Sequence, residues 1–534
     1  MHVDVIEGFD ALDSVRDDWE AVYAADPEAS VFMSWRWIAD CLATHRSVWL
    51  ILAAKPTPAD DRYVAFLPLR MQVRFHPTCG FINELSLAGG GYSDHAGLLA
   101  HPAFESAAVA ALGDHLRKKL HWARLTLANL WMSDRRRRLF LSGFDAHRFV
   151  HKDITYIDPV TQTDNNVCPS VALPSDWDAY LGSLSANHRQ KIRRGLRKVD
   201  AAENYAIMPA DAETWGDDID ALLGFWKAKW AGRKGAKAEA IINRNRAMLS
   251  RCAYNGTLFL PVFRHRDAEG DRAVAALAIL VDPVKKAMLF FIGGRDETYA
   301  EAPAGYLLHA YSLRHAIAQG FSTYHFLLGN EPYKYVFAAQ EQRLKACSVA
   351  TRSGRNLGET LDPRGLGAMR DIAVDLERKA DVPAAERAYR QILTLQPDDP
   401  LTLYRLGRLR ASRGDHAEAA LHLSRSVALD PLGANAWLKL AHARRAIGDD
   451  AGALDAGREV VRLRPDSEDA KALILQLALA ARQAPIAPRL WRAPPAAPRF
   501  GEGAGSPPPW MRPGPGQRGA PAPEASQGAS DLTT

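Results

Sequence analysis

The sequence predicts an α/β (α+β) part over residues 1 to 350, followed by an all-α solenoid of helical repeats and a disordered tail rich in proline and glycine. Strand-like and helix-like segments alternate in the first part, a 34-residue period governs the C-terminal third, and proline and glycine dominate the end. A chain of 534 residues is too long for one compact core, since domains typically hold about 100–200 residues. The expected divisions are 1–165, 166–355, 366–483 and 484–534.

The composition is that of an ordinary globular protein, with 47% hydrophobic and 24% charged residues. The net charge of +5 is too small to indicate a nucleic-acid-binding protein. Five cysteines stand far apart without a Cys-x-x-Cys pair, so neither a metal site nor a disulfide framework is expected. The N-terminus lacks the pattern of a signal peptide and no segment has the length of a membrane span, which favours a cytoplasmic protein.

Helices and strands of the first part follow from hydrophobic periodicity and capping residues. We expect a helix over Ser34 to His45, a strand over Tyr63 to Val73 and a basic helix over Ser185 to Val199. Strands are expected over Thr257 to Phe263, Ala273 to Val281 and Ala287 to Gly294, and a final strand is TYHFLL. The sequence DPVKK between the last two of the three is typical of a turn, so these strands should form an antiparallel hairpin.

After this hairpin, a helix is expected between Pro303 and Gly320, since proline favours the first helical turn and glycine follows the last. The unpaired N–H groups and positive dipole end of such a helix suit a pyrophosphate or a carboxylate. The residues that would form this site are Gly293, Gly294, Pro303, Ala304, Gly305 and Tyr306. The alternative is a hairpin and a helix that merely pack together.

The C-terminal third contains a repeat of 34 residues. The period relates Pro397, Pro431 and Pro465, and it equally relates Ala385, Ala419 and Ala453, while Gly414 and Gly448 share it. Small alanines that let two helices pack closely, and a proline that ends the second helix, are typical of tetratricopeptide repeats (TPR). Residues 467 to 483 are expected to form the capping helix of this solenoid. Residues 484 to 534 hold 12 prolines and 7 glycines, which predicts disorder.

Several separated pieces of the first 350 residues resemble the CelD-like acyltransferases of the GNAT superfamily, relatives of the FemAB aminoacyltransferases. They are FLPLRM (66–71), LAGGGYSDHAGLL (87–99), SANHRQKIRRGLRKV (185–199) and the run from Phe290 to Phe337, in which GNEPYK (329–334) is the most specific motif. The resemblance implies two GNAT-like folds in tandem, the second shaped for an acyl donor such as acetyl-CoA, with the acceptor between them. It also implies transfer to amines or hydroxyls of cell-envelope or exopolysaccharide precursors, and the repeats suggest a protein partner.

Transfer from a thioester needs positioning, a hydrogen-bond donor to the developing oxyanion and a base for the nucleophile's proton. Asp94 matches an acidic position of the family and could deprotonate the acceptor, or it could simply form a turn. In GNEPYK, Lys334 could offset negative charge and Tyr333 could protonate the leaving thiolate, with Glu331 beside them. A structural turn held by Pro332 is the competing interpretation.

The basic helix is the segment that the resemblance places on the acceptor side. Arg189, Lys191 and Arg193 could therefore hold a phosphate or a sugar-nucleotide pyrophosphate, although a solvated helix face explains the same charges. Trp230 could stack on a sugar, but its spacing from Trp226 also fits a core stripe.

One family feature is missing, because no R-x-x-G-x-G/A sequence precedes the helix at Gly305. Three functions therefore remain open at the level of sequence. The first is acyl transfer from acyl-CoA, the second is tRNA-dependent aminoacyl transfer of the FemAB type, and the third is a non-catalytic GNAT–TPR adaptor.

Overall fold

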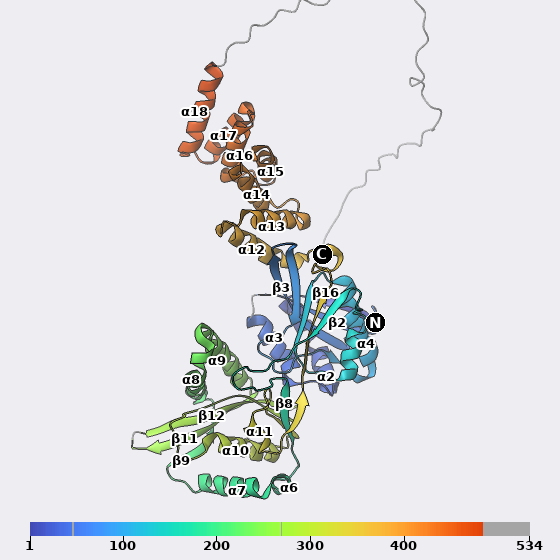
Figure 1. Ribbon diagram of the computed structural model, residues 1–534, viewed down its shortest axis with the longest axis vertical. Helices are drawn as coiled ribbons and strands as arrows, with labels where there is room; N and C mark the ends of the chain where they lie inside the picture. Colours follow the sequence, from blue (N-terminus) through green and yellow to red (C-terminus); the bar gives the residue numbers. More distant parts are fainter. Residues whose placement is uncertain (45–46, 269, 484–534) are drawn as a thin grey trace, which may run out of the picture. The chain divides into compact units, whose positions relative to one another are not determined.

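The computed structural model describes residues 1–44, 47–268 and 270–483 (Figure 1). Two mixed sheets with helices on their faces occupy the first part of the chain, and helical hairpins follow from residue 366. The predicted fold class, an α/β part followed by an all-α repeat array, is confirmed. The tail predicted over 484–534 lies outside the described residues.

The first sheet has the strand order β1-β2-β3-β4-β6-β16-β7, with β5 paired to β3. Only β4 and β6 run parallel; the other neighbours in this sheet are antiparallel. Its strands are β1 (His2–Ile6), β2 (Val48–Lys55), β3 (Ala65–His76), β4 (Gly80–Leu87), β5 (Leu99–Ala100), β6 (Arg124–Leu130), β7 (Phe149–Asp153) and β16 (Lys345–Thr351). The accompanying helices are α1 (Phe9–Ser14), α2 (Arg16–Ala25), α3 (Trp35–Thr44), α4 (Glu105–Lys119) and α5 (Asp134–Leu141), with 3₁₀ turns at Val31–Met33 and Pro102–Phe104.

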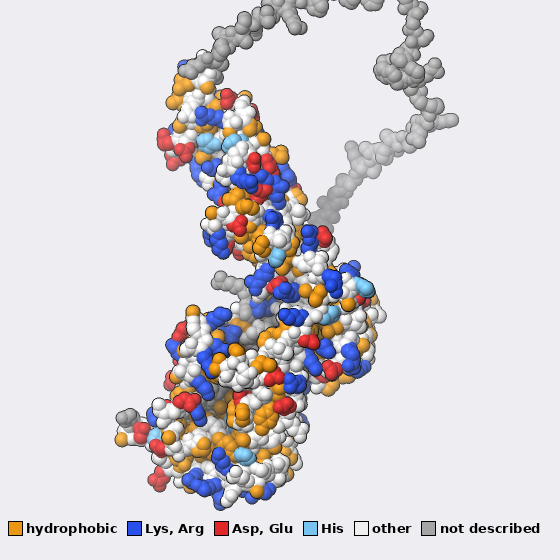
Figure 2. Space-filling view, in the orientation of Figure 1, with side chains coloured by type: hydrophobic (Ala, Val, Ile, Leu, Met, Phe, Trp, Pro, Cys, Tyr) orange, Lys and Arg blue, Asp and Glu red, His pale blue; other side chains and the backbone are white. Residues whose placement is uncertain are grey.

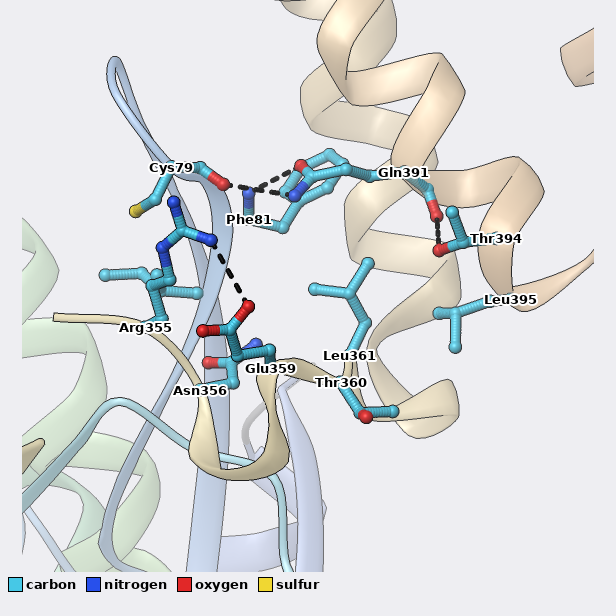
Figure 3. Close-up of a pocket in the computed structure, with 11 residues that line it drawn as sticks. Cys79, Phe81, Arg355, Asn356, Glu359, Thr360, Leu361, Gln391, Thr394 and Leu395 are labelled. Carbon is cyan, nitrogen blue, oxygen red and sulfur yellow. Dashed lines mark hydrogen bonds and ion pairs between the residues drawn. The ribbon is translucent and has the colours of Figure 1, made fainter. Parts of the chain in front are cut away.

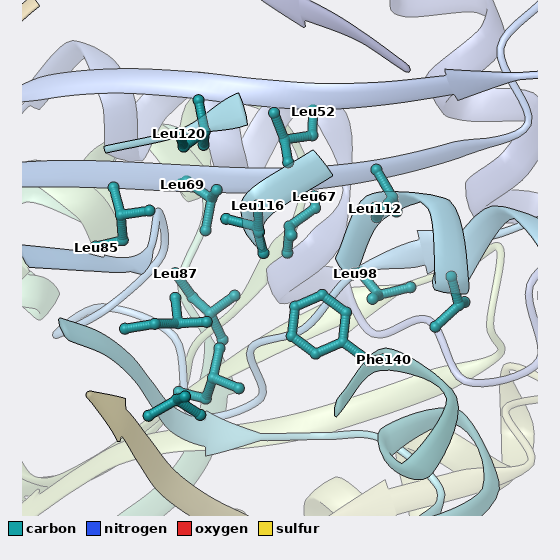
Figure 4. Close-up of a cluster of buried hydrophobic side chains, with 14 of the residues drawn as sticks. Leu52, Leu67, Leu69, Leu85, Leu87, Leu98, Leu112, Leu116, Leu120 and Phe140 are labelled. Atoms are coloured by element: carbon teal, nitrogen blue, oxygen red, sulfur yellow. The ribbon is translucent and has the colours of Figure 1, made fainter. Parts of the chain in front are cut away.

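The core of the first sheet is built mainly from leucines (Figure 4). Leu112 and Leu116, one turn apart on α4, are fully buried in this core. They share it with alternate residues of the strands, such as Leu67 and Leu69 of β3. The i, i+4 spacing of a helix and the i, i+2 spacing of a strand thus place both apolar faces in one layer.

The second sheet has the order β15-β8-β14-β13-β12-β11-β9, with β10 paired to β12. Its strands are β8 (Val167–Ala172), β9 (Tyr205–Pro209), β10 (Leu258–Phe259), β11 (Pro261–Asp267), β12 (Gly270–Asp282), β13 (Ala287–Arg295), β14 (Thr323–His325) and β15 (Gln340–Arg343). The helices are α6 (Trp177–Ser183), α7 (Ala186–Asp200), α8 (Trp215–Lys234), α9 (Ala238–Tyr254), α10 (Ala304–Ala318) and α11 (Pro332–Tyr335), with a 3₁₀ turn at Gly235–Lys237.

The predicted hairpin is confirmed, since β12 and β13 pair antiparallel from Asp282↔Ala287 onward. The helix predicted after Pro303 is α10, and Gly320 just beyond its end has φ of +75°. The strand predicted over Thr257 to Phe263 is instead two strands, β10 and β11, separated by Leu260. TYHFLL forms a strand only over Thr323–His325, because the chain then turns toward Gly329.

The two sheets are joined by shared packing and by the path of the chain. Leu280 and Leu289 of the second sheet are buried in the same cluster as Phe32 and Ile38, which accompany the first sheet. After β15 completes the second sheet, one residue, Leu344, leads into β16, which pairs with β6 and β7 of the first sheet. The expected unit 166–355 thus contains one strand, β16, that long-range pairing places in the first sheet.

The repeat array consists of α12 (Leu366–Arg378), α13 (Val382–Leu395), α14 (Pro400–Ser412), α15 (His416–Leu429), α16 (Ala434–Ala446), α17 (Asp450–Leu463) and α18 (Glu468–Gln483), preceded by 3₁₀ turns at Leu357–Glu359 and Pro363–Gly365. Ala385, Ala419 and Ala453 are each fully buried, as close helix packing requires. The predicted helical repeats are confirmed.

The array packs on the tip of the β3–β4 hairpin (Figure 3). Phe81 of β4 is buried with Met369 and Tyr389 of the first repeat. The side chain of Gln391 accepts a hydrogen bond from Phe81 N (2.8 Å) and donates one to the carbonyl of Cys79 (3.1 Å). A strand end that would otherwise expose unpaired backbone groups is therefore covered by α13.

The first repeat contains a strained alanine. Gly414 and Gly448, each following the first helix of a repeat, have φ of +85° and +83°, and Ala380 occupies the equivalent position with φ of +58°. Because this left-handed region is unfavourable for a residue with a Cβ, Ala380→Gly should raise the free energy of unfolding by about 1 kcal/mol. Urea unfolding of the full chain measures it, and Gly414→Ala should shift stability in the opposite direction. An Ala380→Gly chain that is no more stable would contradict the prediction.

Candidate functional site

The GNEPYK segment forms a compact turn whose lysine points inward. Gly329 adopts φ of +100°, and Pro332 begins the four-residue helix α11. The Nζ atom of Lys334, which is 2% exposed, donates to the carbonyls of Leu328 (2.6 Å) and Gly329 (2.9 Å) and pairs with Oε2 of Glu331 (2.9 Å). Two of the three ammonium donors thus have a carbonyl acceptor, and the nearby Glu331 carboxylate balances the charge. Burial lowers the pKa of Lys334, while the Glu331 carboxylate raises it.

Asp94 lies near this lysine although the two residues are far apart in the sequence. Burial raises the pKa of the half-buried Asp94 carboxyl to about 7, against the opposing effect of the Lys334 charge. Cys168 of β8 belongs to the same group: burial raises the pKa of its thiol to about 12, with Asp94 adding to the shift and Lys334 reducing it. A carboxyl that titrates near neutral pH is suited to take up and return a proton.

A buried histidine, His309 of α10, adjoins the same group. Its Nδ1 lies 3.1 Å from the hydroxyl of Tyr324, and its ring centroid is 5.8 Å from that of Tyr333. Burial lowers the pKa of His309 to about 3, and the positive charge of Lys334 acts in the same direction. His309 is therefore a neutral hydrogen-bonding group. Tyr333 itself is 42% exposed at the edge of this group.

A second feature is a cavity of about 410 Å³ between α7 and the start of α10. Three cations of α7, Lys191, Arg194 and Lys198, line it opposite Pro303 and Tyr306. Lys and Arg side chains gather on the surface over α7 (Figure 2). No side chain caps the N-terminus of α10. Cations that face the start of a helix without a side-chain cap suit a phosphate-bearing ligand.

Close packing between these helices depends on a glycine. A Cβ on Gly195 would lie 2.5 Å from Cδ2 of Leu307, so a larger residue would push α7 away from α10. The Lys191 Nζ lies 4.7 Å from the ring centroid of Tyr306, an interaction that holds the lysine at the cavity wall. Tyr306 also stacks on Phe337, which lies 5.7 Å from the ring of His309, so an aromatic cluster joins the cavity to the group around Lys334.

The structure brings some of the predicted site residues together and separates others. Asp94 interacts electrostatically with Lys334, which pairs with Glu331, and Lys191 lines the α7–α10 cavity with Pro303 and Tyr306. Lys191 thus faces the start of α10, where the donor was expected, although the sequence analysis placed it on the acceptor side. Arg193 instead pairs with Asp178 at 2.9 Å, and Arg189 lies outside the cavity lining.

Gly293 and Gly294 lie within β13, away from the cavity lining, and packing explains both glycines. A Cβ on Gly293 would lie 2.9 Å from Leu277 Cδ2, and one on Gly294 would lie 2.9 Å from the Leu222 carbonyl of α8. Gly305, in the first turn of α10, has open space at the same position. Trp230 on α8 lies beneath the cations of Lys229 and Arg233.

Sequence reasoning missed Cys168, His309 and the pair His95 and His325. A lone histidine in an apolar helix, such as His309 in YLLHAYSL, or a cysteine in an apolar strand gives no distinctive signal.

Within residues 1–44, 47–268 and 270–483, no group of three or more His, Cys, Asp or Glu residues is placed to hold a metal ion. No helix in the described part of the chain is long and apolar enough to cross a membrane.

Comparison with known proteins gives a family match within each part of the chain. Residues 186–335 match the family model of the acetyltransferase (GNAT) domain, and residues 370–433 and 404–468 match a tetratricopeptide-repeat model. Cellulose synthase operon protein C of Pseudomonas fluorescens (strain SBW25) is 29% identical over 132 residues, which are 25% of this chain and 10% of that protein. The chain therefore spans about a tenth of the length of this curated relative.

Solved structures with similar parts include MamA, 26% identical over 22% of this chain and 66% of that chain, with a TM-score of 0.22. A mutant O-GlcNAc transferase of Thermobaculum terrenum is 31% identical over 22% of this chain and 23% of that chain, with a TM-score of 0.21. The first TPR of Spaghetti (RPAP3), bound to an HSP90 peptide, is 16% identical over 23% of this chain and 97% of that chain, with a TM-score of 0.22.

Proposed function

Because the chain carries a GNAT-type acetyltransferase domain followed by tetratricopeptide repeats, we propose that it transfers an acyl group from an acyl-CoA, acetyl-CoA in the simplest case, to an amine or hydroxyl acceptor. The observation that carries this proposal is the α7–α10 cavity, in which Lys191, Arg194 and Lys198 face the uncapped N-terminus of α10. These groups fit the phosphates of coenzyme A without the arginine-glycine sequence that the chain lacks, because backbone N–H groups and side-chain cations supply the same interactions.

The proton chemistry is assigned to Asp94. A thioester supplies the activated acyl group when it is bound, and the acceptor must lose a proton as it attacks. The Asp94 carboxyl, whose pKa is raised to about 7 by burial, can take that proton at neutral pH. Lys334 lowers the pKa of Asp94 by its charge and holds the carbonyls of Leu328 and Gly329 in place, so its proposed role is positioning and electrostatic. Glu331 holds Lys334, and Tyr333 remains the proposed proton donor to the leaving thiolate.

The acceptor is proposed to be a precursor of the cell envelope or of an exopolysaccharide. Support comes from the resemblance of the first 350 residues to CelD-like acyltransferases and from the name of the relative, cellulose synthase operon protein C. The repeats are proposed to bind a protein partner, since stacked helical repeats present extended concave surfaces for binding. A cavity of about 480 Å³ lined by Trp437, Arg444 and Arg458 is the candidate contact point in this array.

Calorimetric titration of the full chain with acetyl-CoA, desulfo-CoA and ADP tests the donor assignment. Lys191→Ala should weaken acetyl-CoA binding roughly tenfold, since a charge-assisted hydrogen bond contributes about 1.5–3 kcal/mol. Arg197→Ala on the same helix is the matched control, because Arg197 is exposed and does not line the cavity. Equal effects of the two variants would contradict the assigned site.

If none of the three ligands binds, acyl-CoA transfer is wrong and two functions remain. Charged tRNA is then the next ligand, and binding that weakens steeply with salt would support aminoacyl transfer from tRNA. A chain that binds neither coenzyme A nor tRNA would be a non-catalytic adaptor whose repeats carry the function.

A further inference from the structure

A cavity of about 240 Å³ lies between residues of the first-sheet region and residues of the second-sheet region. The first-sheet region contributes Ser30, His95 and Trp131, and the second-sheet region contributes Lys285, His325 and Gln342. One water takes about 30 Å³ in the liquid, so the cavity is several times larger than a site for one structural water. It is smaller than the roughly 300–1,000 Å³ of pockets for drug-sized ligands, which favours a small molecule or one residue of a larger one.

Two imidazole nitrogens at this cavity have no hydrogen-bond partner among the described residues. His95 is 1% exposed and its ring stacks on Trp131, with centroids 4.1 Å apart. Its Nδ1 lies 3.3 Å from the Ser30 hydroxyl, but its buried Nε2 is unpaired. His325 stands nearly perpendicular to His95 at 5.6 Å, and its buried Nδ1 is also unpaired. A buried polar atom without a partner costs about 1–3 kcal/mol, so both positions favour a hydrogen-bonding ligand.

The charged groups at the cavity are already engaged by protein atoms. The Lys285 Nζ donates to the carbonyls of Ala24 (3.0 Å) and Asp26 (2.7 Å). The Asp282 carboxylate accepts from the Tyr23 hydroxyl and from Lys285 N. Burial lowers the pKa of His325 to about 4 and that of His95 well below its usual value, so both imidazoles are neutral at pH 7. A ligand here meets hydrogen-bonding groups but no free charge, which favours an uncharged, hydroxyl-bearing molecule over an anion.

We propose that this cavity binds the hydroxyl-bearing part of the acceptor, an uncharged sugar residue or a polyol of similar size, through His95 Nε2 and His325 Nδ1. The identification of this ligand as the acceptor rests on the proposed function; the sugar site itself does not. Asp94, the carboxyl proposed to take the acceptor's proton, directly precedes His95 in the chain, although it is not among the residues that line the cavity. The Trp131 stack and the Ser30 contact fix the His95 ring before any ligand arrives, which lowers the entropic cost of binding.

D-Glucose is the probe, titrated into the full chain carrying ¹⁵N-labelled histidine. We expect the imidazole resonances of His95 and His325 to shift with glucose and those of His315 to stay, because His315 stacks on Phe259 elsewhere in the second half. His95→Ala and His325→Ala should each weaken glucose binding about tenfold, as loss of a hydrogen bond at a buried site requires. His315→Ala, which also removes a half-buried histidine, should leave the affinity unchanged.

Two parallel titrations make the result specific. Cyclohexanol has a ring of the same size as glucose but only one hydroxyl, and it should shift neither imidazole resonance. Cellobiose should shift the same two resonances if the cavity accepts the end of a glycan. It should shift neither if the cavity accepts only a free monosaccharide. No shift of His95 or His325 by either sugar, or an equal loss of affinity in His315→Ala, would overturn the inference.

Acetyl-CoA binding, measured on the same samples, separates this inference from the proposed function. A chain that binds acetyl-CoA but shows no sugar-dependent shift at His95 or His325 retains the proposed function and refutes the sugar site. A chain that shows the shifts but binds no form of coenzyme A retains the sugar site and refutes acyl-CoA transfer.

Discussion

Asp94→Asn is expected to lower kcat/KM for acyl transfer by about 10²–10⁴-fold while leaving acetyl-CoA affinity unchanged. The amide has nearly the same shape as the carboxyl but cannot take the acceptor's proton. The proposed donor cavity between α7 and α10 is lined by other residues, so the acetyl-CoA affinity should not change. Release of the coenzyme A thiol with an amine or hydroxyl acceptor measures turnover, and calorimetry measures the affinity. Asp153→Asn, an exposed carboxyl on β7, is the control and should have no effect.

The pH dependence gives the same prediction a second readout. Since burial raises the pKa of Asp94 to about 7, kcat/KM should rise with pH and level off above that value. In Asp94→Asn, the remaining kcat/KM should no longer show this rise with pH. The folded state also holds this proton more tightly than the unfolded state does. The resulting stabilisation is full below the unfolded pKa, near 3.8, and is lost as the pH rises through about 7.

At pH 8, therefore, Asp94→Asn should unfold at a temperature no lower than that of the parent chain. A merely structural carboxylate would give the opposite result, with loss of stability and full turnover per folded molecule. An Asp94→Asn chain that keeps its turnover would contradict the assignment of the base.

Much of the fold could be predicted because local patterns determine it. The 34-residue spacing of Ala385, Ala419 and Ala453 requires helical hairpins that pack through small residues. The DPVKK turn and the interval from Pro303 to Gly320 define a hairpin and the helix after it. The return of β16 to the first sheet could not be predicted, because its pairing with β6 depends on contacts across most of the chain rather than on its own composition.

The same distinction explains the candidate site. Lys191 and Tyr306 each lie in a recognisable basic helix or helix start, but their meeting at one cavity depends on close packing of α7 against α10 at Gly195. Asp94 and Lys334 were each singled out by motif, whereas their electrostatic coupling required the tertiary structure. His95 and His325 lie inside pieces that carry the family resemblance, but nothing in those pieces distinguishes the two histidines. Their unpaired nitrogens become visible only where the two sheets pack together.

Arg136→Met is expected to lower the free energy of unfolding by about 3–5 kcal/mol, because it leaves buried carboxylates unpaired. Arg136 is 2% exposed and donates two hydrogen bonds of 2.9 Å to Asp26, whose side chain is fully buried. Its Nε also donates to Glu105 at 2.8 Å. In the sequence this arginine is one of four in a row, a pattern that indicates only a basic surface. Urea unfolding, followed through the first transition, measures the loss.

Arg138→Met on the same helix is the matched control, and it should change stability by less than about 0.5 kcal/mol because Arg138 is exposed. If the unpaired carboxylate causes the loss of stability, adding Asp26→Asn to Arg136→Met should recover part of it.

Asp26 immediately precedes the loop whose Ser30 contacts His95, so the same ion pair holds one wall of the proposed sugar site. Arg136→Met should therefore also weaken the glucose-dependent shift of His95 before the protein unfolds. Equal stability of the Arg136→Met and Arg138→Met chains would show that the buried ion pair does not support this wall.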